Sequence, residues 1–398
     1  MATIIIGAGP AGLRCAERLA EAGQQITVIG AEPGQPYNRV ALSQLLAGDH
    51  EEPELITHDK ARLSALGITY RPSTTVTAID RATATIMLCS GDVLPYDRLV
   101  LALGSRPFRL KLPGADLAGV LMYRTLDDVR QMRQAAETGG RAIVIGGGLL
   151  GLEAAVGLAR RGMPTTVLHA AGHLMERQLD PEAAALLSRR LHGQGIAVEL
   201  NAASVAIAGQ DRATGVTLKD GRTLPADLVV MAVGIRPEAE LARAAGLHVN
   251  RGIVVTAHML SSDPAIHAIG ECAERDGQCC GLVAPAFAQA ETAAQHILGK
   301  KAEYHAAPDS AALKIAGAGV WSAGDIAATD AETLVYDDQD AGEYRKFLLR
   351  DHRLIGAVLY GETADAPWYK QLIGQDVRTF RSALAFGRAY APVLEAAA

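Results

Sequence analysis

Residues 3–33 read TIIIGAGPAGLRCAERLAEAGQQITVIGAEP, and this stretch decides the fold. A short β-branched run leads into a glycine turn, an Ala- and Leu-rich helix closed by a glycine, and a second β-branched run. Gly7 permits the tight turn, Gly9 lets the backbone approach a pyrophosphate, and Gly12 lets the helix pack on the strand. The N-terminus of the helix then faces the phosphates with free N–H groups and the positive end of its dipole. The pattern therefore predicts a βαβ unit that binds a dinucleotide.

An acidic residue stands where such a unit binds ribose. Glu32 lies at the end of the second run, where a carboxylate accepts hydrogen bonds from both ribose hydroxyls. Pro10 and Ala11 open the helix inside the glycine turn and complete the expected cofactor contacts. A glycine-rich turn in another α/β fold is the alternative interpretation.

A second copy of this pattern occupies residues 141–170, RAIVIGGGLLGLEAAVGLARRGMPTTVLHA. Its expected dinucleotide ligands are Gly146, Gly148, Leu150 and Gly151. The acid is missing, because the strand ends in His169. A neutral imidazole neither repels a 2′-phosphate nor holds a 2′-hydroxyl as firmly as a carboxylate does, so NADH and NADPH both remain open. Arginines that could bind a 2′-phosphate are Arg160, Arg161 and Arg177.

Two dinucleotide folds in one chain imply two adenine dinucleotides, and the usual pairing is FAD with NAD(P)H. In that pairing the nicotinamide delivers a hydride to flavin N5, while the protein stacks the two rings and excludes solvent. A length of 398 residues allows two to three domains. We therefore predict an α/β protein with two Rossmann-like dinucleotide-binding domains and a small C-terminal α+β domain. The expected domains are 1–115 with 245–305 for FAD, 116–244 for NAD(P)H, and 306–398 with strands at 332–336, 345–349 and 353–360 and a helix near 367–373.

Composition and charge exclude several classes of partner. The chain carries 44 acidic and 38 basic residues, a net charge of −6, without a long basic run, which argues against nucleic acid and anionic membranes. No signal peptide is visible, and the apolar stretch 142–159 contains GGGLLG, which suits a strand, turn and helix better than a membrane span. Five cysteines in so long a chain indicate a reducing compartment. We expect a cytoplasmic protein.

Four further motifs carry a family resemblance: YNRVALSQLLAG (37–48), LMERQLDPEAAALL (174–187), IHAIGECAERDGQCCGLVAPAFAQA (266–290) and LKIAGAGVWSAGD (313–325). With the two glycine turns they make the chain resemble the FAD-dependent pyridine nucleotide–disulfide oxidoreductases, a glutathione-reductase-like superfamily, over essentially its whole length. Within it, the chain is most similar to the flavoprotein part of the NAD(P)H nitrite reductase large subunit and to stand-alone rubredoxin and ferredoxin reductases. The stretches that resemble the two crossovers between the domains are LALGSRP (101–107) and MAVGIRP (231–237).

The resemblance implies a flavin site. Gly270 and Glu271 stand where the family has Gly-Asp, so Glu271 is expected to bind the ribityl chain. The N–H groups around Val283 and Ala284, at the start of a helix, are expected to face the flavin pyrimidine. Further expected cofactor contacts are Arg39, Gln44, Val76, Ala102, Gly104, Arg106 and Gly234. For the two arginines among them, an ordinary surface position is the alternative.

Glu153 is the catalytic candidate. In the family an acid at this place lies near the flavin and the nicotinamide carboxamide, and the lysine that often pairs with it is Gln44 here. A carboxylate stabilised by the helix dipole is the alternative for Glu153. Trp321, in Val-Trp-Ser, resembles the Trp-Ser of ferredoxin reductases and is expected either to shield the flavin or to pack in the core.

The positions of the cysteines disfavour disulfide chemistry. Residues 37–44 hold no cysteine, and none occurs between Cys89 and Cys272, so neither redox-thiol arrangement of the superfamily is present. Cys272, Cys279 and Cys280 lack the second pair that a metal site needs, and we expect no metal. They are small core residues or, alternatively, thiols that sense oxidation.

We predict an FAD-dependent NAD(P)H oxidoreductase that passes electrons to a separate redox protein, either an iron–sulfur partner of the ferredoxin or rubredoxin type or a component of nitrate or nitrite reduction. No cysteine follows Cys280, so we do not expect this sequence to hold sirohaem. An NAD(P)H oxidase that uses O₂ and a flavoprotein that senses NADH are the alternatives. Residues 325–343 contain seven acids and no base, which form either a solvated edge or a docking surface for a basic partner. Monomer and homodimer both remain open.

Overall fold

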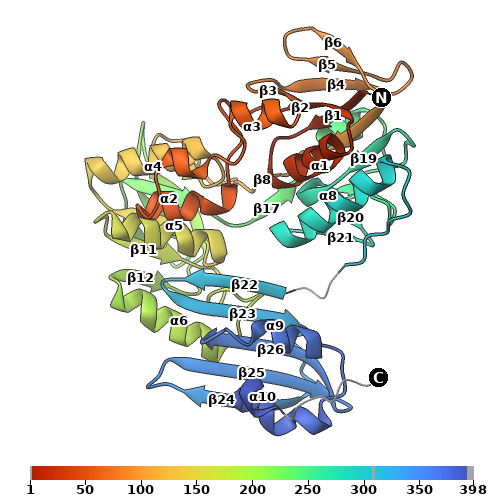
Figure 1. The fold of residues 1–398 in the computed structure, drawn as a ribbon. Helices are drawn as coiled ribbons and strands as arrows, with labels where there is room; N and C mark the ends of the chain where they lie inside the picture. The colour runs from red at the N-terminus through yellow and green to blue at the C-terminus, as the bar shows by residue number, and fades with distance from the viewer. Residues whose placement is uncertain (1, 307–309, 392–398) are drawn as a thin grey trace.

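The computed structural model describes residues 2–306 and 310–391, in which two parallel sheets and one antiparallel sheet mark three regions of the chain (Figure 1). The first sheet is parallel throughout, in the order β19 (Ile266–Ala268), β7 (Arg98–Leu101), β1 (Ala2–Ile6), β2 (Gln25–Ile29) and β3 (Ile68–Arg71). Most side chains of β1 and β2 are buried whichever face they point to, as expected for a parallel sheet covered on both sides. Helix α1 (Pro10–Glu21) packs against β2, and α8 (Val283–Ile297) packs against α1.

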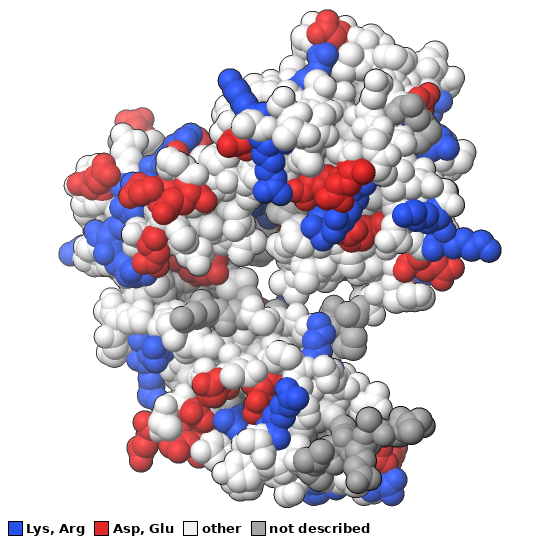
Figure 2. Space-filling model, viewed as in Figure 1, with Lys and Arg blue, Asp and Glu red and all other residues white. Residues whose placement is uncertain are grey.

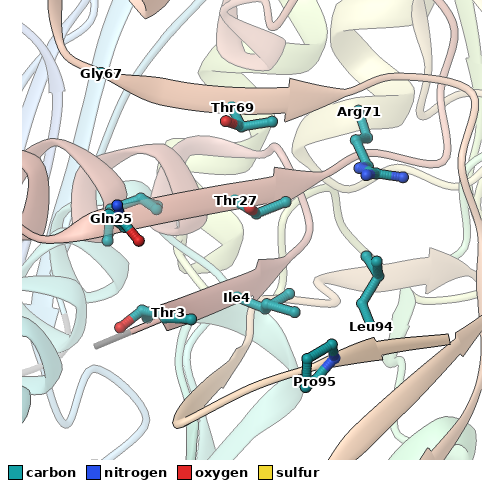
Figure 3. Close-up of a pocket in the computed structure, with 11 residues that line it drawn as sticks. Thr3, Ile4, Gln25, Thr27, Gly67, Thr69, Arg71, Leu94 and Pro95 are labelled. Atoms are coloured by element: carbon teal, nitrogen blue, oxygen red, sulfur yellow. The ribbon is translucent and has the colours of Figure 1, made fainter.

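Three antiparallel strands accompany the first sheet: β4 (Val76–Asp80), β5 (Thr85–Leu88) and β6 (Val93–Pro95). A pocket of about 440 Å³ lies where Gln25, Thr27 and Thr69 of the sheet face Leu94 and Pro95 of β6 (Figure 3). The three strands therefore cover this part of the sheet incompletely.

The second sheet is also parallel throughout. Its order is β12 (Ile196–Glu199), β11 (Thr165–Leu168), β10 (Ala142–Ile145), β16 (Leu228–Met231) and β9 (Val120–Met122). Its helices are α4 (Leu126–Thr138), α5 (Leu149–Arg160) and α6 (Pro181–Gly193), and its antiparallel strands are β13 (Ser204–Gly209), β14 (Ala213–Leu218) and β15 (Thr223–Pro225). The two glycine-turn motifs of the sequence thus form β1–α1–β2 and β10–α5–β11, one in each parallel sheet.

Two short strands join these regions. The segments at the two expected crossovers, β8 (Ser105–Pro107) and β17 (Ile235–Pro237), pair antiparallel, with Arg106 opposite Arg236. The remaining short elements are α3 (Lys60–Ala65), α7 (Glu240–Ala244), β18 (Ile253–Val254), β20 (Ala273–Arg275), β21 (Gln278–Cys279) and 3₁₀ turns at Arg39–Ala41, Glu52–Leu55, Gly270–Cys272, Arg378–Phe380 and Arg388–Tyr390.

The segment after β2 leaves the first sheet and packs on the second. Helix α2 (Leu42–Ala47) lies against α5, where a Cβ at Gly157 would stand 2.6 Å from Leu46 Cγ. The guanidinium of Arg161 donates to the backbone carbonyls of Leu45 and Leu46. The absence of a side chain at Gly157 therefore allows the close approach of α2 and α5.

The C-terminal region is an antiparallel sheet in the order β22 (Ser310–Ile315), β23 (Ala318–Gly324), β26 (Arg353–Gly361), β25 (Glu343–Arg350) and β24 (Glu332–Asp338), followed by α9 (Ala366–Leu372) and α10 (Arg381–Phe386). Strands β24, β25 and β26 and helix α9 were predicted to within a few residues, whereas β22 and β23 were not. Asp180, which caps α6, accepts hydrogen bonds from Tyr344 Oη (2.7 Å) and Lys346 Nζ (2.9 Å) of this sheet. The C-terminal sheet is thereby fixed to the second region.

Figure 2 shows acidic and basic side chains interspersed over the viewed face, rather than a field of one sign. Across residues 2–306 and 310–391, none of the helices combines the length and the apolar character that crossing a membrane requires.

Gly157→Ala tests the close packing of α2 on α5. The added methyl group must displace Leu46, and we expect the overpacking to outweigh the gain in helix propensity and to lower the free energy of unfolding by about 1–2 kcal/mol. Urea unfolding measures this change. Gly193→Ala, in α6, is the matched control because no atom lies within 4 Å of a Cβ placed there. Equal stability of the two variants would contradict the packing argument.

Candidate functional site

A cleft of about 2090 Å³ lies where the three regions of the chain meet. Predicted site residues that line it are Gly7, Gly9, Pro10, Ala11, Glu32, Arg39, Gln44, Ala102, Gly104, Arg106, Leu150, Glu153, Gly270, Glu271, Val283, Ala284 and Trp321. Predicted site residues that are not among its described lining residues are Gly12, Val76, Gly146, Gly148, Gly151, His169 and Gly234. Val76 is 7% exposed and belongs to the core of the first region. The cleft reaches from the first glycine turn (residues 7–12) to the helix that follows the second (residues 146–151).

The first glycine of each turn allows a close approach between two segments of backbone. Gly7 has φ +116° and Gly146 has φ +125°, a region that side chains with a Cβ rarely adopt. A Cβ at Gly7 would overlap the backbone carbonyl of Ala102, and one at Gly146 would overlap that of Ala232. Both parallel sheets therefore use the same contact between the glycine turn and the strand beside it.

The other glycines of the two turns also correspond. A Cβ at Gly12 would overlap the carbonyl of Gly7, and one at Gly151 that of Gly146, so both are needed for the helix to pack on its own turn. In contrast, nothing lies within 4 Å of a Cβ placed at Gly9 or Gly148. Both positions face open space. Such space is required where the backbone must come close to the phosphates of a dinucleotide.

Three helices whose first residues line the cleft begin without side-chain caps. Helices α1, α5 and α8 have no side-chain hydrogen bond at the N-cap, whereas Asp59, Thr125 and Asp180 cap α3, α4 and α6. Helix α8 begins at Val283, where the sequence predicted a helix start. The free N–H groups at the starts of α1, α5 and α8 are suited to hydrogen-bond acceptors of a ligand.

Glu32 is held at the end of β2 by two neighbours. The hydroxyl of Tyr37 donates to Glu32 Oε2 (2.7 Å), and Arg39 forms an ion pair with Glu32 Oε1. The carboxylate remains partly exposed and lines the cleft, so it is available to ribose hydroxyls. Arg39, predicted as a flavin or diphosphate ligand, is thus placed beside the ribose acid.

Glu271 is held by a residue that the sequence argument missed. Ser105 Oγ donates to Glu271 Oε2 (2.8 Å), and Arg124 forms an ion pair with the same oxygen. Arg39 Nη1 in turn donates to the backbone carbonyl of Arg124 (2.5 Å). The signal in the sequence is a basic residue two positions after the end of strand β9 and directly before Thr125, the N-cap of α4. Arg124 links the acid of the expected flavin site to the second region.

Glu153 lies in the first turns of α5, and its side chain reaches the cleft together with Ser43, Gln44 and Tyr123. Burial raises the pKa of Glu153 to about 7, and a hydrogen bond from Ser43 partly opposes that rise. Burial, and then the nearby charge of Glu153, hold the pKa of Tyr123 well above its usual value. Glu153 therefore carries a proton for part of the time near neutral pH, and the lysine that often pairs with this acid in the family is the neutral Gln44 here, which lines the same cleft.

Two other predicted residues lie at the edges of this site. Trp321, in β23, is 2% exposed, lines the cleft and stands with its ring 6.3 Å from that of Tyr369. It is therefore both a wall of the cleft and a member of the C-terminal core. Arg106 is 57% exposed at its side chain and lies 3.6 Å from Glu238, the position of a surface arginine.

The cysteines are unpaired, and burial raises the pKa of both Cys272 and Cys280 to about 12. Both thiols are thus protonated at neutral pH, a form that is neither a nucleophile nor a metal ligand. Within residues 2–306 and 310–391, no group of three His, Cys, Asp or Glu side chains is arranged to hold a metal ion.

Two family profiles match the chain. The profile of the pyridine nucleotide-disulphide oxidoreductases matches residues 1–296, and that of the rubredoxin NAD⁺ reductase C-terminal domain matches residues 310–377. The chain is 42% identical to the assimilatory nitrate reductase electron transfer subunit of Bacillus subtilis over 91% of this chain and 48% of that protein. It spans about half the length of the nitrate and nitrite reductase proteins that it matches.

Other relatives are of similar length to this chain. The chlorobenzene dioxygenase ferredoxin reductase component of a Cupriavidus species is 35% identical over 91% of this chain and 89% of its own. Among solved structures, a ferredoxin reductase from Rhodopseudomonas palustris superimposes with a TM-score of 0.88 at 30% identity, covering 96% of this chain and 100% of its own. Putidaredoxin reductase, in its covalent complex with putidaredoxin, gives a TM-score of 0.87 at 29% identity, covering 96% and 95%.

Gln44→Lys tests the environment of Glu153. A cation in this part of the cleft favours the ionised carboxylate, so we expect the pKa of Glu153 to fall from about 7 to about 6 or below. The infrared band of the protonated carboxyl, identified by its loss in Glu153→Gln, then appears at lower pH than in the original protein. Gln131→Lys, on the exposed side of α4, is the control and should leave the titration unchanged. An unshifted midpoint in Gln44→Lys would show that the two side chains do not interact.

Proposed function

The chain belongs to the pyridine nucleotide-disulphide oxidoreductase family, and we propose that it is an FAD-dependent NAD(P)H reductase that passes electrons to a separate protein with an iron–sulfur centre. The observation that carries the proposal is the cleft, which reaches from the first glycine turn to helix α5, directly after a second turn of the same construction. None of the described residues that line it is a cysteine.

The residues of the first region fit FAD. Gly9 leaves open space at the start of the uncapped α1, where a pyrophosphate can approach, and Glu32 lies at the end of β2 for the ribose. Glu271 is in place for the ribityl chain, and the free N–H groups at the start of α8 face the cleft for the flavin ring. FAD, when bound there, accepts a hydride from the nicotinamide and releases electrons singly to the partner.

The residues of the second region fit the nicotinamide dinucleotide. Gly148 leaves open space at the start of α5, which also has no side-chain cap. Glu153 follows on the same helix and extends into the cleft that reaches the flavin site. We assign to Glu153 the positioning of the nicotinamide, since its carboxyl can donate or accept a hydrogen bond near neutral pH.

The choice of acceptor rests on the relatives and on the walls of the cleft. The relatives include ferredoxin reductases, rubredoxin reductases and an electron transfer subunit of nitrate reductase. Trp321, Pro367 and Lys370 of the C-terminal region line the cleft, so this region forms part of its wall. These features favour a protein acceptor over O₂.

The test compares acceptors for the FAD-loaded protein supplied with NADH, using a [2Fe–2S] ferredoxin and rubredoxin as probes in air and without oxygen. We expect at least one probe to be reduced about tenfold or more faster than O₂ is consumed. Gly148→Val is the matched variant, because its side chain meets no protein atom within 4 Å of Cβ and fills the space for the pyrophosphate. This variant should keep FAD and lose about a hundredfold in reduction by NADH.

Oxygen consumption that accounts for all of the NADH oxidised would contradict the proposed function and favour an oxidase. If Gly148→Val were reduced by NADH at an unchanged rate, the second glycine turn would not be part of the nicotinamide site. Gly193→Ala should leave both rates as they are.

A further inference from the structure

We propose that Glu176, held in place by His169, makes this chain select NADH over NADPH. The inference rests on the proposed function, because it takes the second glycine turn as the site of the nicotinamide dinucleotide. Glu176 then takes the place of the ribose-binding acid, which is missing because His169 stands at the end of β11.

The loop after β11 folds back onto the second glycine turn. The backbone N–H of Met175 donates to the carbonyl of Gly147 (3.0 Å), and Leu174 and Met175 are buried. A Cβ at Gly147 would stand 2.6 Å from both Leu174 Cδ2 and His169 Cγ, so the glycine is what lets the loop lie there. Glu176, the next residue, is therefore fixed beside the turn.

His169 connects the end of β11 to Glu176. The backbone N–H of Gly147 donates to His169 Nδ1 (3.1 Å), which makes Nδ1 the acceptor nitrogen of the ring. The hydrogen is then on Nε2, which lies 3.1 Å from Glu176 Oε2 and donates to it. The side chain of His169 is 10% exposed, whereas that of Glu176 is 46% exposed. A buried ring thus positions a solvent-facing carboxylate.

The position of this carboxylate matches that of a ribose ligand. In a Rossmann unit the pyrophosphate lies at the glycine turn and the adenosine ribose lies at the end of the second strand. Glu176 contacts the side chain at that strand end and adjoins the residue bonded to the turn. Its oxygens can accept hydrogen bonds from ribose hydroxyls, and its charge repels a 2′-phosphate.

Two of the three arginines that could bind a 2′-phosphate do not offset this charge. Arg160 forms a two-bond ion pair with Asp49 (2.6 and 2.7 Å), and Arg161 donates to backbone carbonyls of α2. Both of these candidates for binding a 2′-phosphate are therefore engaged elsewhere. Arg177 is exposed and adjoins Glu176, so it is the cation that the experiment must examine.

Binding of two probes that carry no nicotinamide, ADP-ribose and 2′-phospho-ADP-ribose, tests the proposal on the FAD-loaded protein by titration calorimetry. We expect ADP-ribose to bind about tenfold or more tightly than its 2′-phosphate, and Glu176→Gln to reduce this ratio to about two or less. Asp211→Asn, which removes an exposed carboxylate from the same region in the hairpin between β13 and β14, is the matched control and should keep the original ratio.

His169 is tested as a positioning residue through the same ratio. His169→Ala should lower the ratio of affinities for the two probes, but less than Glu176→Gln does. The double variant should show the same ratio as Glu176→Gln alone. A general loss of packing would weaken both probes equally and leave the ratio unchanged.

Three results would overturn the proposal: equal affinity for the two probes, a ratio unaffected by Glu176→Gln, or tighter binding of the 2′-phosphate that is lost in Arg177→Ala. Failure to bind either probe would overturn both this proposal and the nicotinamide site of the proposed function. If the protein showed the expected ratio of affinities for the two probes but reduced no iron–sulfur acceptor, only the proposed function would be contradicted.

Discussion

The structure depends on one close contact, made twice: a glycine turn that packs against the backbone of a neighbouring strand and against its own helix. Gly7 and Gly12 make this contact in the first sheet, and Gly146 and Gly151 make it in the second. Because a Cβ would fit at none of the four, the strand and helix meet closely, and the middle glycine of each turn is left facing open space. The site at each turn is therefore a consequence of the packing that forms the fold.

The remaining structure brings the first glycine turn and helix α5, which follows the second turn, to one cleft. Helix α2 carries the chain from the first region onto α5 of the second, and Arg124 returns from the second region to Glu271. The C-terminal sheet is fixed to α6 through Asp180 and closes the cleft with Trp321. Electron transfer between two cofactors requires such a shared, partly closed space, and each of the three regions supplies part of its wall.

The sequence was sufficient to predict the features that depend on local pattern. Both glycine turns, the strands beside them and most of the C-terminal strands follow from residue type and spacing, and the start of α8 follows from the family resemblance. Features that depend on contacts between distant segments could not be predicted in this way. Arg124 acquires its role from an ion pair with Glu271, and the loop that carries Glu176 is identified only by its hydrogen bond to Gly147. The domain limits, the roles of the site residues and the iron–sulfur centre of the acceptor stay predictions, and the choice between monomer and homodimer stays open.

The central claim is that one chain holds two different dinucleotides at its two glycine turns. The most direct test is an anaerobic titration of the FAD-loaded protein with NADH, in which protein-bound flavin is followed by absorbance and free flavin by filtration. We expect one FAD per chain, complete bleaching with one equivalent of NADH, and no release of flavin. Displacement of FAD by NADH, or a chain that retains no flavin, would contradict the claim, because the two turns would then share a single ligand or bind none.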